Sequence, residues 1–257
     1  MTDLLFKTVV VTILLSLSVW PGTGHTQECP SIEAARKAIS KRNVKVIGVT
    51  PGPVPGLCQV HIKHQDISRV LYIDKAGEHL IAGNIYRISN GTNLTGEAVA
   101  DLNRFTEEEL ERLEKLVAFT IGTGKKTLFI ATDPQCGYCT MAEEILESMA
   151  ESGQIKVKFL MFPLAFHKGA REECISLVCD KKGLEGLREN YISENQCREG
   201  ISKVDETIAF LKKKGISGTP AYIFDDGLTI SGVMTREALV KKLGLAAGSE
   251  SEQESSK

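Results

Sequence analysis

Residues 132–140 read TDPQCGYCT and place Cys136 and Cys139 two residues apart, directly after the apolar run TLFIA at 127–131. The run predicts a buried strand, and CTMAEEILESMAE at 139–151 predicts a helix. If the strand ends near Asp133, the loop delivers Cys136 to the N-terminus of that helix, whose unpaired amides and positive dipole end stabilise a thiolate. Cys139 then lies one turn away on the same face. Two such sulfurs can close a reversible disulfide, and the less exposed one can attack a mixed disulfide formed by the first.

The same CxxC spacing occurs in zinc sites and in structural disulfides. A zinc site needs a second pair of ligands at similar spacing. The remaining candidates, Cys174 and Cys179, are separated by four residues and are followed by no histidine cluster. A disulfide over so short a loop stabilises little. The pattern therefore favours a redox centre over a metal site or a purely structural disulfide, and we expect neither a metal nor a cofactor.

A second informative motif is GISGTPAYIF at residues 215–224, where Thr219 and Pro220 immediately precede an apolar strand. A proline at this point must begin the strand or serve a special turn, because it cannot donate to a strand ladder. In thioredoxin-like folds this is the place of a cis-proline loop that faces the active-site disulfide, and Thr219 would offer its backbone to a bound peptide. The alternative is a trans proline in an ordinary loop.

Outside these two motifs, the pattern of predicted helices and strands divides the chain into two parts. From residue 126 onward it reads strand, helix, strand, further helices, two strands and a last helix, the order of a thioredoxin-like α/β domain. Before it, SIEAARKAISKR at 31–42 predicts a short amphipathic helix, and β-rich runs between turn compositions predict a small antiparallel sheet over 44–88. TEEELERLEKLVAF at 106–119 opens with a capping box and predicts a helix between the domains.

The two ends and the composition indicate an exported protein. Lys7 is followed by thirteen mostly apolar residues, TVVVTILLSLSVW, and then by PGTGHT, which is typical of a cleaved signal peptide; an uncleaved anchor or a buried helix is the alternative. Seven cysteines suit an oxidising compartment, where disulfides persist. The polar end, residues 247–257, is predicted to be disordered. A net charge of −2 gives no reason to expect a nucleic-acid partner.

Taken together, TDPQCGYCT, GISGTPAYIF, a separate β-rich domain, a linker helix and a signal peptide resemble the periplasmic thiol:disulfide isomerases of the DsbC/DsbG family. The resemblance implies a signal peptide over 1–24, a cystatin-like dimerisation domain over 28–100, a linker helix over 101–120, a thioredoxin-like catalytic domain with a helical insertion over 121–246, and a tail over 247–257. It implies a V-shaped homodimer whose uncharged cleft holds misfolded or mis-oxidised exported proteins, and a membrane thiol reductase of the DsbD type that keeps the CxxC reduced.

The resemblance also assigns residues. It makes Cys136 and Cys139 catalytic, and it places the substrate against Gly137, Tyr138, Thr219 and Pro220. Cys179 and Cys197 lie where the family carries a structural disulfide, although Cys174 competes for either partner. Cys29 and Cys58 look like an added disulfide in the dimerisation domain, and Cys174 is an extra cysteine.

Three functions therefore stand in competition. The leading one is a disulfide isomerase and reductase with a chaperone-like cleft. The second is a periplasmic dithiol oxidase, although such oxidases lack the N-terminal domain. The third is a chaperone or binding protein whose redox activity is secondary.

Overall fold

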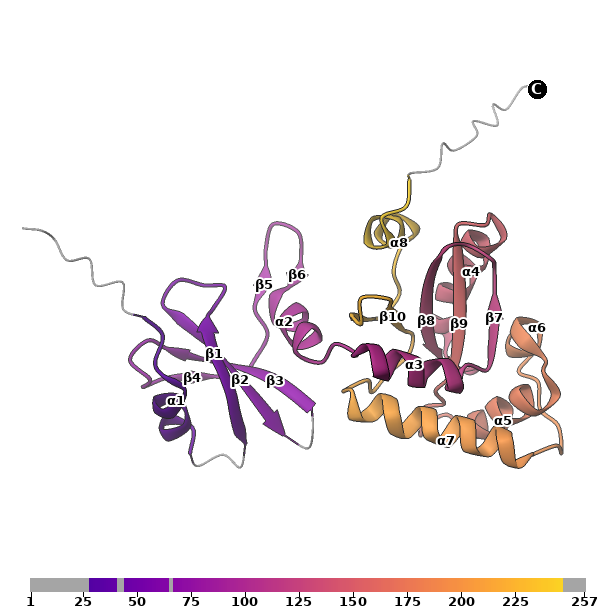
Figure 1. Cartoon of the computed structure of the whole chain (residues 1–257), viewed down its shortest axis with the longest axis horizontal. Coiled ribbons are helices and arrows are strands. Elements are labelled where there is room, and N and C mark those ends of the chain that lie inside the picture. Colours follow the sequence, from indigo (N-terminus) through magenta and orange to yellow (C-terminus); the bar gives the residue numbers. More distant parts are fainter. Residues whose placement is uncertain (1–27, 41–43, 65–66, 247–257) are drawn as a thin grey trace, which may run out of the picture.

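The computed structural model describes residues 28–40, 44–64 and 67–246. The expected signal peptide over 1–24 and the expected tail over 247–257 lie outside these residues. The described chain forms two units, each with its own sheet (Figure 1). Of the helices in these ranges, none is long and apolar enough to cross a membrane.

The N-terminal unit is the predicted short helix followed by a small antiparallel sheet. In β2 alternate residues are buried, so one face of the sheet packs against α1 and forms a core of its own. Ser31 begins α1 by accepting a hydrogen bond from the amide of Ala34. The sheet order is β1-β2-β3-β4, and a separate hairpin of β5 and β6 leads into α2. The elements are α1 (Ile32–Ala38), β1 (Lys45–Pro51), β2 (Leu57–His64), β3 (Ile67–Asp74), β4 (Leu80–Ile81), β5 (Tyr86–Arg87), β6 (Thr92–Asn93) and α2 (Leu94–Leu102).

The segment between the units differs from the expected single linker helix over 101–120. The structure has α2, which ends at Leu102, and a separate α3 (Glu107–Leu116). The break occurs because the Asn103 side chain turns back to β3, where it accepts from the amide of Ser68 and donates to its carbonyl, both at 2.9 Å.

Helix α3 packs on the C-terminal unit instead of standing free. Its predicted capping box is present, with Thr106 and Glu109 exchanging hydrogen bonds. The buried side chains of Leu113 and Leu116 lie in one apolar cluster with Phe210 of the C-terminal unit. The chain therefore joins the second unit already at Phe105, whose amide donates to the carbonyl of Gly227 at 2.9 Å.

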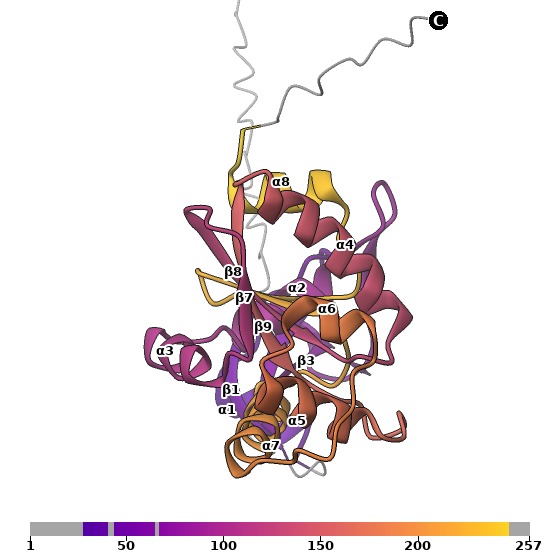
Figure 2. The ribbon, with the colours of Figure 1, turned by 90° about the vertical axis from the view of Figure 1, so that its right-hand side faces the viewer.

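The C-terminal unit is a five-stranded mixed sheet with helices on both faces (Figure 2). The strand order is β11-β10-β8-β9-β7, with β8 and β9 parallel and the other pairs antiparallel. The order of elements predicted from residue 126 onward is confirmed; β7 is an additional edge strand. The elements are β7 (Phe119–Ile121), β8 (Lys126–Thr132), α4 (Gly137–Glu151), β9 (Ile155–Met161), α5 (Ala170–Asp180), α6 (Gly183–Arg188), α7 (Arg198–Lys213), β10 (Ala221–Phe224), β11 (Thr229–Ser231) and α8 (Arg236–Leu243).

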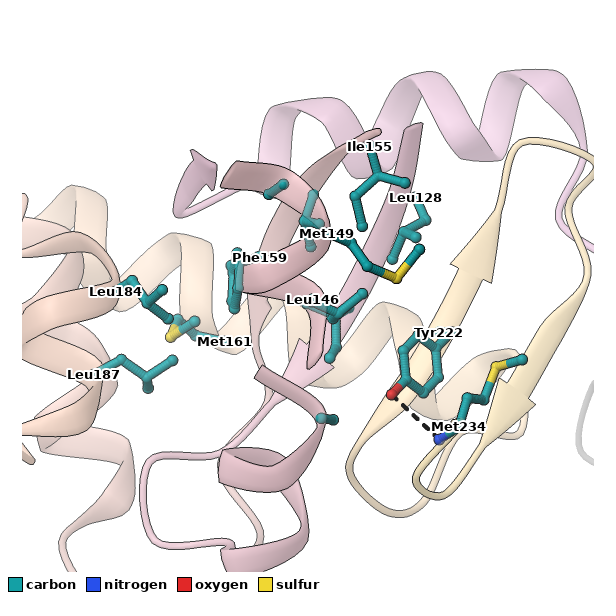
Figure 3. Close-up of a cluster of buried hydrophobic side chains, with 14 of the residues drawn as sticks. Leu128, Leu146, Met149, Ile155, Phe159, Met161, Leu184, Leu187, Tyr222 and Met234 are labelled. Carbon is teal, nitrogen blue, oxygen red and sulfur yellow. Dashed lines mark hydrogen bonds between the residues drawn. The ribbon is translucent and has the colours of Figure 1, made fainter. Parts of the chain in front are cut away.

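Strand β8 is buried on both faces, which explains its continuous apolar run. Leu128 and Ile130 belong to a cluster with residues of α4, α8 and the α5–α6 segment. Figure 3 shows Leu128 together with Leu146 and Met149 of α4. Phe129 and Ala131 face the second cluster, with α3 and α7. The end of β8, where Cys136 follows, is thus fixed from both sides of the sheet.

Candidate active site

Cys136 is the N-cap residue of α4, as the strand-to-helix prediction required. Strand β8 ends at Thr132, a short turn follows, and the amide of Cys136 donates to the carbonyl of Asp133 at 3.1 Å. No side chain caps this helix end, so Cys136 lies at the positive end of the α4 dipole, beside first-turn amides that have no side-chain partner.

The two sulfurs differ in exposure. Cys136 is 8% exposed and Cys139, one turn further along α4, only 1%. Both are free thiols, so the pair is in its dithiol form. Burial raises the pKa of the Cys139 thiol to about 12, an effect that the hydroxyls of Thr132 and Thr219 partly oppose. Cys136 is thus the sulfur a substrate can reach, and Cys139 is the one behind it.

The Thr219–Pro220 loop faces this pair. The peptide bond between Thr219 and Pro220 is cis, and β10 begins at the next residue. The thiol of Cys136 donates to the carbonyl oxygen of Thr219 at 3.7 Å, which brings together residues separated by 83 positions. The expected cis-proline loop is present at the expected place.

Gly137 and Tyr138 lie on the surface of the first turn of α4. Tyr138 is 68% exposed, and Met141, which follows it at the i,i+3 position, is also exposed. A side-chain carbon added at Gly137 would meet no atom within 4 Å. Together these residues form an open and partly apolar surface next to Cys136.

Asp133 is a buried residue whose carboxylate accepts several hydrogen bonds, a role that was not predicted from the sequence. Its carboxylate accepts from the amide of Gln135 at 2.8 Å, from the amide of Leu164 at 2.6 Å and from Nδ1 of His167 at 2.9 Å. These bonds hold the loop after β9 against the CxxC turn. The position of this aspartate at the end of a buried strand could have identified it from the sequence as a candidate site residue. His167 lies 34 positions away in the chain, so the sequence alone could not link it with Asp133.

A second polar group lies behind Cys139. Thr132, the last residue of β8, is fully buried, and its hydroxyl donates to Oε1 of Glu143 on α4. Burial raises the pKa of the Glu143 carboxyl, while the Thr132 hydrogen bond and the charge of Arg188 act in the opposite direction. In sequence, Glu143 is one of several acidic residues in a helix, so its burial could not be foreseen.

Four of the other cysteines form two disulfides, and the fifth is a free thiol. Cys179 at the end of α5 is joined to Cys197, the N-cap residue of α7, and Cys29 is joined to Cys58 of β2. Cys174 is a fully buried free thiol, and its pKa is raised well above the ordinary value, first of all by that burial.

Among the described residues, one group of three side chains has the spacing of a metal site: Asp74, Glu78 and His79. Both oxygens of Asp74 are already engaged, with Oδ1 accepting from the amides of Glu78 and His79 and Oδ2 contacting Nδ1 of His79 at 2.8 Å. These bonds, led by the one from the His79 side chain, lower the pKa of Asp74 to about 2. The group is an exposed turn between β3 and β4.

Two family models match the chain. Residues 26–96 match the disulfide bond isomerase protein N-terminal domain. Residues 114–247, just over half of the chain, match the thioredoxin-like domain. The predicted thioredoxin-like fold with a separate N-terminal domain is thereby confirmed.

The chain is also similar to characterised proteins over most of its length. The thiol:disulfide interchange protein DsbC of Salmonella typhimurium is 26% identical over 226 residues, which cover 85% of this chain and 87% of the relative. DsbC of Escherichia coli K12 is 27% identical over 204 residues, 77% of this chain and 81% of the relative. Among solved structures, the catalytic domain of Proteus mirabilis ScsC aligns with a TM-score of 0.43 at 18% identity, over 52% of this chain and 94% of that one.

Proposed function

Because the chain belongs to the DsbC/DsbG family of thioredoxin-like thiol:disulfide interchange proteins, we propose that it is a protein disulfide isomerase and reductase that works through Cys136 and Cys139. The observation that carries this proposal is the pairing of Cys136, at the uncapped N-terminus of α4 and facing the cis-proline loop, with a buried Cys139 one turn behind. That arrangement provides one accessible nucleophile and one protected resolving thiol.

The reaction begins when the Cys136 thiolate attacks a substrate disulfide. A bond forms between Cys136 and one substrate sulfur, and the other substrate sulfur leaves as a thiolate. In isomerisation, a substrate thiolate then attacks the substrate sulfur bound to Cys136, so a different substrate disulfide forms and Cys136 is released. In reduction, Cys139 attacks Cys136, the substrate leaves reduced, and the CxxC becomes a disulfide.

The substrate chain lies along the Thr219–Pro220 loop in this proposal. Once Cys136 is in a mixed disulfide it no longer donates to the carbonyl of Thr219. That oxygen is then available to a backbone amide of the bound polypeptide, as in the addition of a strand. Tyr138 and the exposed first turn of α4 give the apolar contact, and Gly137 keeps the approach to Cys136 open.

The N-terminal unit serves dimerisation in this proposal. Two catalytic units held on one dimer can retain a partly folded chain through several exchanges. The protein works in the periplasm, where misfolded or mis-oxidised exported proteins are its substrates, and a membrane reductase of the DsbD type returns Cys136 and Cys139 to the dithiol form. The match of residues 26–96 to an isomerase N-terminal domain favours this reading over a dithiol oxidase.

The test compares two activities of the purified protein with those of a Cys136→Ala variant. The wild-type protein is expected to restore activity to a scrambled, fully oxidised substrate enzyme and to reduce insulin, and the variant is expected to do neither. Trapping thiols in cells should find Cys136 and Cys139 mostly reduced. A pair found oxidised at steady state, together with failure to reactivate the scrambled enzyme, would instead indicate a dithiol oxidase.

A further inference from the structure

The surface beside Cys136 forms a groove between the CxxC turn and the helical insertion. The groove has a volume of about 490 Å³, and Cys136 itself is part of its lining. The other lining residues that matter here are Gln135 before Cys136, Thr140 on α4, Glu173 on α5 and Asn190 after α6. Because Cys136 lines the groove, a residue next to the attacked cysteine of a substrate comes within reach of it.

Glu173 gives this groove its charge. Among the described residues that line the groove, Glu173 is the one acidic residue, and none is a lysine, an arginine or a histidine. The groove therefore presents a negative charge close to the reacting sulfur, and no positive side chain in its lining balances that charge.

The Gln135 side chain fixes the Glu173 carboxylate beside the CxxC turn. Nε2 of Gln135 donates to Oε1 of Glu173 at 2.7 Å and to the carbonyl oxygen of Lys168 at 2.8 Å. Both amide protons of Gln135 are thereby used. The backbone amide of Gln135 donates to the buried carboxylate of Asp133 at 2.8 Å. The position of Glu173 is thus set by the residue directly before Cys136.

The Glu173 carboxylate has few partners within the protein. Its Oε2 is shielded from solvent and has no hydrogen-bond partner. In the described part of the chain no ion pair joins Glu173 to a basic side chain, and Arg171 on the same helix is engaged by Asp205 at 2.7 Å. A carboxylate can accept roughly four hydrogen bonds, and a shielded oxygen without a donor is unfavourable. A positively charged donor that entered the groove would therefore be stabilised.

We propose that this groove is a substrate subsite for a positively charged side chain, lysine or arginine, next to the cysteine that Cys136 attacks, and that Glu173 determines this preference. The ammonium or guanidinium group donates to the Glu173 carboxylate while the substrate backbone lies along the Thr219–Pro220 loop. The inference rests on the proposed function and names a class of substrate for it: disulfide-bonded polypeptides with a basic residue beside the reactive cysteine.

The two kinds of contact around Cys136 can be separated by experiment. Tyr138 and Met141 offer exposed apolar surface, which binds any side chain with an apolar stem. A charge-assisted hydrogen bond to Glu173 requires a charged donor. Lysine and norleucine have similar stems and differ in the ammonium group, so a comparison of the two isolates the contribution of Glu173.

The test measures how fast Cys136 attacks short peptides whose one cysteine is joined to thionitrobenzoate. The Cys136 sulfur bonds to the peptide sulfur and thionitrobenzoate leaves as a coloured thiolate, so stopped-flow absorbance on the whole reduced protein gives the rate of attack. The peptides carry lysine, norleucine or glutamate directly before the cysteine, and in a second set directly after it. The quantity compared is the ratio of the lysine rate to the norleucine rate within one protein, so that a general effect of a substitution on Cys136 cancels.

In one of the two sets, the wild-type protein should attack the lysine peptide about fivefold faster than the norleucine peptide at low salt, and the glutamate peptide most slowly. In Glu173→Gln, which keeps an oxygen for the Gln135 side chain, the ratio should fall to about one. Asn190→Asp adds a second carboxylate to the groove and should raise the ratio. Asn190 is exposed, and aspartate tolerates its left-handed backbone with φ of 50°.

The matched control is Glu172→Gln, which removes an exposed carboxylate of the same helix that does not line this groove and should keep the wild-type ratio. A wild-type ratio of about one in both sets would overturn the subsite. An equal loss in Glu172→Gln would also overturn it, because long-range attraction would then suffice. If Glu173→Gln did not fold, a ratio in Asn190→Asp no higher than in the wild-type protein would have the same meaning.

These peptides test the subsite separately from isomerisation. If the lysine preference depended on Glu173 in a protein that could not reactivate a scrambled enzyme, the isomerase proposal would be wrong and the subsite would stand. If the protein isomerised but attacked lysine and norleucine peptides equally fast, the subsite alone would be wrong.

Discussion

At the scale of single residues, Cys136 is the more accessible sulfur of the CxxC and Cys139 the more protected one. Cys136 meets the open helix end and the Thr219 carbonyl, whereas Cys139 lies in the interior beside Thr132 and Glu143. The same helix holds Cys136 at its N-cap and withdraws Cys139 from water. The two residues therefore have different tasks although their side chains are identical.

Replacing each cysteine in turn should separate these tasks. Cys136→Ser is expected to abolish all thiol exchange, because no other active-site sulfur is accessible. Cys139→Ser should still attack and should accumulate mixed disulfides, since the resolving thiol is gone. Gel electrophoresis of acid-quenched reactions without reductant measures both. Equal alkylation rates of the two thiols in the wild-type protein under mildly acidic conditions would contradict this division.

The burial of Glu143 should also make the free energy of unfolding depend on pH. Burial raises the pKa of Glu143 above its ordinary value of 4.5, so the folded chain still holds this proton at a pH where the unfolded chain has released it. The free energy of unfolding then falls as the pH rises through this interval, and the full contribution is present only below the unfolded pKa. Glu143→Gln carries no such proton.

Urea unfolding should therefore show Glu143→Gln gaining stability relative to the wild-type protein as the pH rises above the ordinary carboxyl pKa of 4.5. Glu144→Gln is the control, because that side chain is exposed. If the difference in unfolding free energy between the wild-type protein and the variant did not change as the pH rose, Glu143 would be ionised to the same extent in the folded and the unfolded chain.

At the scale of elements, the sequence was sufficient to predict a helix or strand where the residues that determine it lie close together in the chain. The run before Cys136, the helix after it and the proline before β10 were all predicted, because strand burial, helix periodicity and proline geometry are local properties. The break between α2 and α3 was not predictable in this way. It depends on Asn103 reaching back to Ser68, and on Leu113 and Leu116 finding Phe210 almost a hundred residues later.

The site shows the same limit. Asp133 and Cys136 are close in sequence, but Leu164 and His167, two partners of Asp133, come from the loop after β9. Glu143 looks like any other acid on a solvated helix until the fold buries it against Thr132. Residues that act through contacts between elements carry no periodic signal of their own.

The helical insertion is closed by the Cys179–Cys197 disulfide. The bond joins the end of α5 to the start of α7 across a separation of 18 residues. On the loop-entropy model, the double variant Cys179→Ala/Cys197→Ala should lose about 3 kcal/mol of unfolding free energy, measured by urea titration. Peptide mapping of the oxidised wild-type protein should recover Cys174 as a free thiol. A peptide that linked Cys174 to Cys179 or Cys197 would contradict this pairing.

The whole molecule has separate cores on either side of Asn103. The N-terminal core is formed by α1 and the sheet of β1 to β4, and the two C-terminal clusters include Phe105 and α3. Each unit therefore has a hydrophobic core of its own, and the short segment after α2 connects the two units (Figure 1). Under the proposed function, the C-terminal unit performs thiol exchange and the N-terminal unit supplies the second catalytic unit by dimerising.

A chain shortened to begin at Asn103 tests this division of labour. It keeps Phe105, Leu113 and Leu116, all of which belong to the C-terminal core, whereas a start within β7 would remove them and expose Phe210. The shortened protein is expected to fold as a monomer and to reduce insulin at a rate per active site close to that of the whole chain, because Cys136, Cys139 and the Thr219–Pro220 loop are all retained. It should fail to reactivate a scrambled substrate enzyme, since isomerisation requires a partly folded chain to be held through several exchanges. Light scattering gives the oligomeric state, and refolding yields give the isomerase activity. If the whole mature protein proved monomeric, or if the shortened chain isomerised as well as the whole, the dimeric isomerase would give way to a simple reductase built on the same pair of cysteines.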